Sequence, residues 1–163
     1  YVAPYYDGFI RRRTFTLIIT TSNKASGGNM ARILVVDDED GPRIVTARWL
    51  TRIGGHEIVE AIGSKDAVRK CTTALYDLII TDHAMPDMLG TELIAYLRSL
   101  PAMAHTPSIL LTATPPVGFL PDGKMLFLQV KPICDWPAFL RLVSRAIGGR
   151  SATPPGTPPP SPA

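Results

Sequence analysis

Short apolar runs alternate along the middle of the chain with longer stretches in which apolar residues recur every three or four positions. A run of four or five apolar residues is typical of a buried β-strand, and the wider spacing is typical of a helix with one buried face. Because strands alternate with helices, the pattern predicts an α/β fold with a doubly wound parallel sheet covered on both faces. The five predicted strands are Arg32–Val36, Glu57–Ala61, Leu78–Thr81, Ser108–Leu111 and Leu126–Val130.

Helical spacing is found at four places between and after these strands. The predicted helices run from Pro42 to Gly54–Gly55, from a Ser64 cap to Thr73, from Thr91 to Leu100, and from Asp135 to Gly148–Gly149. Serine and aspartate suit helix starts and glycine suits helix ends. In the first helix, the recurring face that we expect to be buried carries Ile44, Val45, Arg48, Trp49 and Ile53.

The connection between the fourth and fifth strands departs from this rhythm. Residues 113–124 hold three prolines and two glycines at the place where a helix is expected. Both residue types disfavour the interior of a helix. We therefore expect the fourth helix of the fold to be short or absent.

Composition divides the chain into three parts. Residues 30–150 carry the pattern of strands and helices and are expected to form the folded domain. Residues 1–29 are interpreted as an N-terminal extension that is disordered or non-native. Residues 151–163 contain six prolines, which favours a disordered, proline-rich tail.

The net charge of +3 lies outside the predicted domain. Residues 1–29 hold four basic residues and one acidic residue, so the domain is neutral and we expect no direct binding to DNA. Since no apolar run approaches the roughly 18 to 20 residues of a membrane span, no membrane association is expected. Cys71 and Cys134 match neither a metal spacing nor a disulfide framework, which favours the reducing cytoplasm.

Residues that can carry chemistry stand at the carboxyl ends of the predicted strands. Asp37 and Asp38 follow the first strand, Asp82 the third, Thr112 the fourth and Lys131 the fifth. These ends share one edge of a parallel sheet, where neighbouring carboxylates repel one another and need a cation. Their hard oxygens favour Mg²⁺. A dication beside a lysine and a hydroxyl can receive a phosphoryl group.

Four motifs, in this order, resemble the receiver domain of bacterial two-component response regulators, of the single-domain, chemotaxis-regulator type. They are Leu34–Asp38, Asp82–Pro86 with Gly90, Leu111–Ala113, and Lys131–Pro132. The resemblance extends from about Ala31 to Gly149 and implies a flavodoxin-like fold with a five-stranded parallel sheet. The reduced fourth-helix region marks a divergent member.

The resemblance also implies roles for individual residues. Asp82 would be the phosphoacceptor, taking its phosphoryl group from the histidine of a kinase or phosphotransfer protein. Mg²⁺ would be bound by the carboxylates of Asp38 and Asp82, by the backbone carbonyl of Ala84, and by Asp37 mainly through water.

Thr112 and Lys131 would each bind a phosphoryl oxygen, and the Lys131–Pro132 peptide bond would be cis. The resemblance implies no enzyme activity beyond self-phosphorylation from a donor and slow loss of the phosphate. The signal would pass by protein–protein interaction to a downstream partner that the sequence does not identify.

Two departures from the family leave alternatives open. The aromatic residue that normally lies three positions before the lysine is replaced by Leu128, and strand alternation directs Phe127 to the opposite face. Together with the reduced fourth-helix region, this keeps open a receiver-like interaction module that is never phosphorylated. An origin as the C-terminal receiver of a hybrid histidine kinase also stays open.

A rival interpretation starts from Asp38, Glu39, Asp40 and Gly41, which resemble the first motif of haloacid-dehalogenase-type phosphohydrolases. Asp38 would then be the nucleophile. However, a proline follows where a small hydroxyl or aliphatic residue is usual, no acidic pair follows the lysine, and the third strand's aspartate would have no task. These departures favour the receiver.

Overall fold

The computed structural model describes residues 30–148, and the predictions for residues 1–29 and 149–163 lie outside this range. Within it, strands and helices follow one another as predicted, with boundaries shifted by a few residues. The elements are β1 (Arg32–Val36), α1 (Asp40–Arg52), β2 (Glu57–Ala61), α2 (Ser64–Cys71), β3 (Leu78–Asp82), α3 (Gly90–Ser99), β4 (Ser108–Thr112), β5 (Leu126–Val130) and α4 (Trp136–Gly148).

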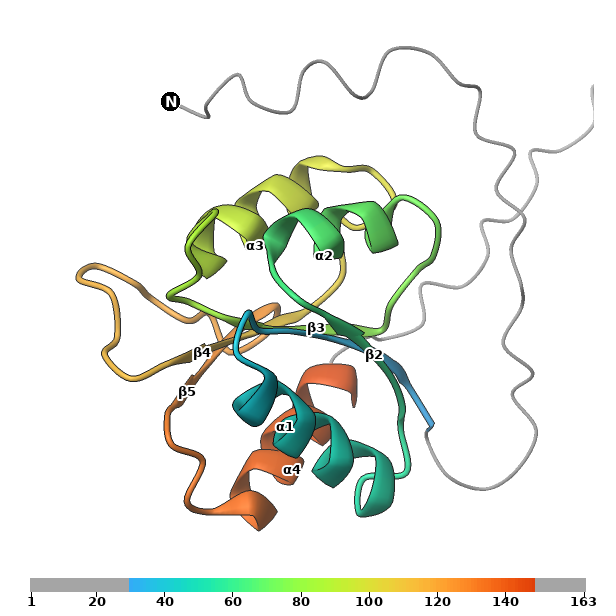
Figure 1. The fold of residues 1–163 in the computed structure, drawn as a ribbon, viewed down its shortest axis with the longest axis vertical. Coiled ribbons are helices and arrows are strands. Elements are labelled where there is room, and N and C mark those ends of the chain that lie inside the picture. The colour runs from blue at the N-terminus through green and yellow to red at the C-terminus, as the bar shows by residue number, and fades with distance from the viewer. Residues whose placement is uncertain (1–29, 149–163) are drawn as a thin grey trace, which may run out of the picture.

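The five strands form one parallel sheet in the order β2-β1-β3-β4-β5. Helices α1 and α4 cover one face of this sheet, and α2 and α3 cover the other (Figure 1). This order is the flavodoxin-like one, in which the chain reverses its winding direction beside β1. The predicted doubly wound α/β fold is therefore confirmed. Among residues 30–148, no helix is both long and apolar enough to span a bilayer.

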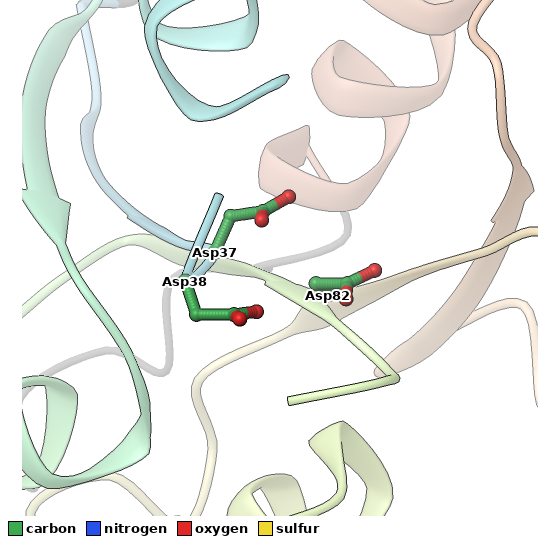
Figure 2. Close-up of side chains that lie close together, drawn as sticks. All are labelled: Asp37, Asp38 and Asp82. Carbon is green, nitrogen blue, oxygen red and sulfur yellow. The ribbon is translucent and has the colours of Figure 1, made fainter. Parts of the chain in front are cut away.

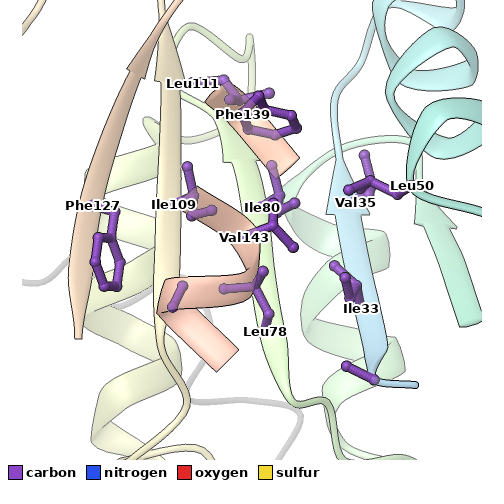
Figure 3. Close-up of a cluster of buried hydrophobic side chains, with 12 residues drawn as sticks. Ile33, Val35, Leu50, Leu78, Ile80, Ile109, Leu111, Phe127, Phe139 and Val143 are labelled. Atoms are coloured by element: carbon purple, nitrogen blue, oxygen red, sulfur yellow. The ribbon is translucent and has the colours of Figure 1, made fainter. Parts of the chain in front are cut away.

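Alternation along the strands divides the core into two apolar clusters, one on each face of the sheet. Figure 3 shows the cluster under α1 and α4, where Phe139 and Val143 pack against side chains of the central strands. The second cluster lies under α2 and α3 and includes Leu34, Leu93 and Leu97. Strands β3 and β4 are buried along their whole length. Such strands give the carboxyl edge of the sheet a rigid base.

No helix forms between β4 and β5 within the described part of the chain, which confirms the expectation for residues 113–124. The connection instead projects as a loop (Figure 1). Asp122 Oδ1 organises its second half by accepting hydrogen bonds from the amides of Lys124, Met125 and Leu126, at 2.7 to 2.8 Å. The face of β5 opposite Phe127 thus lacks a covering helix, and Val130 is exposed there.

The prediction for the buried face of α1 was wrong. Ile44, Val45 and Ile53 are exposed. The residues of α1 that are buried are Arg43, Thr46, Ala47 and Leu50. The prediction assumed that only apolar side chains of this helix are buried. Arg43 is charged, but a charged side chain can be buried when it has hydrogen-bonding partners, so hydrophobic periodicity pointed to the wrong face.

Ser64 was wrongly predicted to cap α2. It is the first residue inside the helix, and the preceding Gly63 holds the N-cap position with a φ of 136°, which favours glycine. The hydroxyl of Ser64 donates a hydrogen bond to Asp87 Oδ2 at 2.7 Å instead. The start of α2 is therefore tied to the loop that follows β3.

Gly90 is required by the close approach of α3 to the end of β3. A Cβ atom at this position would lie 2.1 Å from the carbonyl oxygen of Asp82 and 2.9 Å from Leu110 Cδ1. We expect Gly90→Ala to lower the free energy of unfolding by about 2 kcal/mol or more, because the backbone itself must shift. Urea denaturation followed by circular dichroism would measure this.

Gly41→Ala is the matched control, since a Cβ at this helical position would meet nothing within 4 Å. Alanine there should leave stability unchanged or raise it by up to about 1 kcal/mol. Equal unfolding midpoints for the two variants would contradict the steric argument.

Candidate functional site

Three carboxylates meet at the carboxyl edge of the sheet. Asp37 and Asp38 follow β1, and Asp82 is the last residue of the adjacent β3 (Figure 2). One ligand oxygen from each lies within 4.8 Å of the others. Asp37 is only 2% exposed and Asp82 is also buried, whereas Asp38 is exposed. The structure thus brings together the acidic residues that the sequence placed at this edge.

Lys131 joins this group from the end of β5. Its Nζ lies 2.9 Å from Asp37 Oδ2 and 2.7 Å from Asp82 Oδ1. Partial burial alone would lower the pKa of Lys131, but the hydrogen bonds and charges of the two aspartates outweigh it and raise the pKa. The ammonium is therefore charged at neutral pH. The Lys131–Pro132 peptide bond is cis, as the resemblance implied.

The charges of the site do not balance. Three carboxylates and one ammonium leave a net charge of −2 at this edge. Among the described residues, the carboxylate of Asp38 makes no hydrogen bond or ion pair, and it faces the same space as the other two (Figure 2). A dication with a preference for oxygen ligands, such as Mg²⁺, fits both the charge and the donor atoms.

Two further predicted site residues, Ala84 and Thr112, lie near this group, and of these two only Ala84 contacts one of its carboxylates. The amide of Ala84 donates to Asp82 Oδ2 at 3.1 Å, which places Ala84 beside the carboxylate. Thr112 ends β4 at the same edge, and its hydroxyl donates to the carbonyl oxygen of Thr114 at 2.7 Å. The Thr112 hydroxyl is therefore engaged with its own loop and not with a carboxylate.

His83 follows Asp82 in the loop after β3. It is half-buried, and its Nδ1 atom is buried without a hydrogen-bond partner within residues 30–148. Its backbone closes the loop after β3, because its amide donates to Leu111 O at 2.8 Å and its carbonyl accepts from Gly90 at 2.9 Å.

Two residues near the site were missed by the sequence analysis. Arg43 buries its guanidinium beside the Asp37 backbone, and Asp87 binds the start of α2. The spacing of Asp40 and Arg43, three positions apart on a helix, is the one signal that could have indicated an ion pair. Nothing in the local sequence indicates that Asp87 and Ser64, 23 positions apart, would meet.

Asp87 joins the loop after β3 to α2 by accepting hydrogen bonds from the Ser64 hydroxyl at 2.7 Å and the Lys65 amide at 3.3 Å. Burial alone would raise the pKa of Asp87, but these hydrogen bonds outweigh it and lower the pKa. A carboxyl group with a lowered pKa stabilises the fold above its unfolded-state pKa, near 3.9. This contribution disappears as the pH falls through the folded-state pKa.

We expect Asp87→Ala to lower the free energy of unfolding by about 1 kcal/mol at pH 7, the usual net contribution of such hydrogen bonds. The difference from the wild type should shrink as the pH falls below about 4, because Asp87 is protonated first in the unfolded chain and only at lower pH in the folded protein. Urea denaturation from pH 7 to pH 3 would measure both. Asp87→Asn keeps an acceptor oxygen that cannot titrate, and it should lose less stability at pH 7. A difference between Asp87→Ala and wild type that stays constant across this pH range would contradict the pKa argument.

Comparison with known proteins gives consistent findings. The family model for the response regulator receiver domain matches residues 33–118. The gliding motility regulatory protein of Myxococcus xanthus is 37% identical over 90 residues, which are 55% of this chain and 12% of that protein. The chain therefore spans only about an eighth of the length of this relative.

Solved structures agree with the fold. Chemotaxis protein CheY4 of Vibrio cholerae has 28% sequence identity and a TM-score of 0.63, covering 72% of this chain and 98% of the other. The receiver domain of sensor histidine kinase PA1611 from Pseudomonas aeruginosa, solved with a magnesium ion in its active site cleft, has 26% identity and a TM-score of 0.64. That match covers 73% of this chain and 98% of the other.

Proposed function

This chain belongs to the response regulator receiver domain family, and from that premise we propose that Asp82 accepts a phosphoryl group from a histidine kinase or a phosphotransfer protein. Receiver domains are signal transducers of two-component systems that interact with such donors, and some lie within histidine kinases. The observation that carries the proposal is the ion pair of 2.7 Å between Lys131 Nζ and Asp82 Oδ1 inside an acidic group.

In the proposed phosphoryl transfer, Asp82 is the nucleophile and Lys131 stabilises negative charge. A carboxylate oxygen of Asp82 forms a bond to phosphorus as the bond between phosphorus and the donor's imidazole nitrogen breaks. That nitrogen keeps the electron pair and takes up a proton from water. Lys131 already lies beside Asp82 and supplies positive charge where phosphoryl oxygens arrive.

Mg²⁺ would be held by the carboxylates of Asp38 and Asp82 and the backbone carbonyl of Ala84, with Asp37 contributing through water. When bound, this ion would neutralise the phosphoryl oxygens and the excess negative charge of the site. The magnesium ion in the related receiver from Pseudomonas aeruginosa supports this assignment. Thr112 would bind a phosphoryl oxygen once its hydroxyl leaves the carbonyl of Thr114.

The structure favours Asp82 over Asp38 as the acceptor. Lys131 pairs with Asp82 and Asp37, whereas Asp38 has no cationic partner among the described residues. The nucleophile of a haloacid-dehalogenase-type phosphatase would have to be Asp38. Whether this receiver acts alone or as part of a hybrid histidine kinase, the acceptor chemistry that we propose is the same.

We expect Asp82→Asn to abolish formation of an acyl phosphate when the protein is incubated with Mg²⁺ and acetyl phosphate. The amide is a poor nucleophile and cannot form the mixed anhydride. Intact-mass spectrometry, with hydroxylamine to cleave the acyl phosphate, would measure the modified fraction. Asp135→Asn is the matched control, since asparagine can keep the N-cap contact with the Ala138 amide, and it should be phosphorylated as the wild type is.

Undiminished acyl phosphate in Asp82→Asn, lost in Asp38→Asn, would support the phosphatase interpretation instead. A wild-type protein that stays unmodified and shows no NMR change with Mg²⁺ and beryllofluoride would support the unphosphorylated interaction module. Leu128 is the feature that makes this second outcome worth testing.

We also expect Mg²⁺ to stabilise the wild-type protein by mass action, with a thermal midpoint that rises with Mg²⁺ concentration. Asp38→Asn removes one ligand charge and should weaken Mg²⁺ binding by at least about tenfold, seen by calorimetry. Because Asp38 is exposed and its carboxylate makes no contact within the described part of the chain, this variant should fold normally without metal. Equal Mg²⁺ affinity in the variant and the wild type would contradict the assignment.

A further inference from the structure

Arg43 is a buried cation that donates a hydrogen bond to the backbone of the acidic site. Its side chain is only 7% exposed, although it lies in the first turns of α1. Nη1 donates to the carbonyl oxygen of Asp37 at 2.9 Å, and Nε donates to Glu60 Oε2 on β2 at 3.1 Å. Nη2 forms an ion pair with Asp40. Three separate parts of the chain therefore meet at one guanidinium.

The contact with Asp37 fixes a particular peptide unit. The carbonyl of Asp37 belongs to the peptide that joins Asp37 to Asp38, so its direction determines where the Asp38 backbone continues. The amide of Asp37 is held by the carbonyl of Ala61 at 3.1 Å, and Asp37 Oδ1 accepts from the amide of Glu39 at 2.9 Å. Asp37 is thus fixed on both sides, and Arg43 supplies the contact on the side of Asp38.

Asp38 depends on this support because its own carboxylate has no partner within residues 30–148. Since no contact within this range holds the Asp38 side chain itself, its position depends on the position of the Asp38 backbone. A ligand that is held in place before binding loses less conformational entropy when the metal arrives. The guanidinium does not neutralise the acidic group, since the carboxylates of Asp40 and Glu60 already more than offset its single positive charge.

We propose that Arg43 is a positioning residue for the metal site, which holds the Asp37–Asp38 peptide so that the Asp38 carboxylate is ready to bind Mg²⁺. This inference rests on the proposed function of the same site. It assigns to Arg43 an effect on metal affinity and none on the acceptor Asp82, which Lys131 contacts from the carboxyl end of β5.

The decisive test compares Mg²⁺ dependence in the full chain of wild type and Arg43→Lys. Lysine keeps the charge, but its single Nζ cannot reproduce the three contacts that Nε, Nη1 and Nη2 of the planar guanidinium make in fixed directions. We expect the Mg²⁺ dissociation constant from calorimetry to rise roughly ten- to a hundred-fold. Phosphorylation by acetyl phosphate should need correspondingly more Mg²⁺ but reach the wild-type rate, within about twofold, at saturation. An unchanged Mg²⁺ midpoint, or a lower plateau without a shift in midpoint, would overturn the proposal.

A second variant covers the case in which Arg43→Lys does not fold. Glu60→Ala removes one anchor of the guanidinium from a partly exposed position while Asp40 still balances its charge. We expect a smaller shift of the Mg²⁺ dissociation constant in the same direction, of about threefold. Glu57→Ala is the matched control, because Glu57 also lies on β2 and pairs with Arg32, at the opposite end of the strand. If Glu60→Ala and Glu57→Ala bind Mg²⁺ equally, the proposal is wrong.

A measurement without metal separates positioning from a general loss of structure. In the metal-free protein, the amide of Glu39 should exchange its hydrogen at least several-fold faster in Arg43→Lys, while amides of β3 stay protected. Uniformly faster exchange would mean a structural role alone and overturn the proposal. A wild-type protein that binds no Mg²⁺ and forms no acyl phosphate would instead disprove the proposed function itself.

Discussion

The contact of one lysine with two buried aspartates is the interaction on which the site depends. Asp37 and Asp82 end neighbouring strands, and two carboxylates so close together repel each other in surroundings that water hardly reaches. Lys131 offsets this repulsion from β5, two strands away from β3 in the sheet. Among residues 30–148, the third carboxylate, that of Asp38, has no counter-charge. The fold thus tolerates an acidic edge that is two charges short of neutral, which is the condition for holding a dication.

The sequence was sufficient to predict the sheet and the residues at its carboxyl edge. Asp37, Asp38, Asp82 and Lys131 could be found because parallel strands bring their ends together, so that position along the chain translates directly into position in space. The absence of a helix after β4 could be predicted from proline and glycine. The roles assigned to these residues stay predictions, and so do the domain limits at 30 and 150.

What could not be predicted depends on contacts between side chains far apart in the sequence. The buried face of α1 is set by Arg43 and its partner Glu60 as well as by apolar residues, and hydrophobic periodicity cannot register such a pair. The hydroxyl of Ser64 bonds to Asp87 for the same kind of reason. The first contact joins α1 to β2, and the second joins the loop after β3 to the start of α2. The edge strand β2 and its connection to α2 therefore support the site without contributing a carboxylate to it.

The loop between β4 and β5 can change conformation at a lower free-energy cost than a packed helix. Thr112 holds Thr114 through one hydroxyl, and Asp122 holds three amides at the other end of the loop. Displacing a packed helix means exposing apolar side chains, whereas rearranging this loop exchanges a few hydrogen bonds, each contributing about 1 kcal/mol. Exchanging two or three of these hydrogen bonds therefore involves a free energy similar to the coupling free energies of about 1 to 3 kcal/mol that link distant sites in proteins. The phosphorylation of Asp82 that we propose would need to supply only a coupling free energy of this size to change the conformation of the loop.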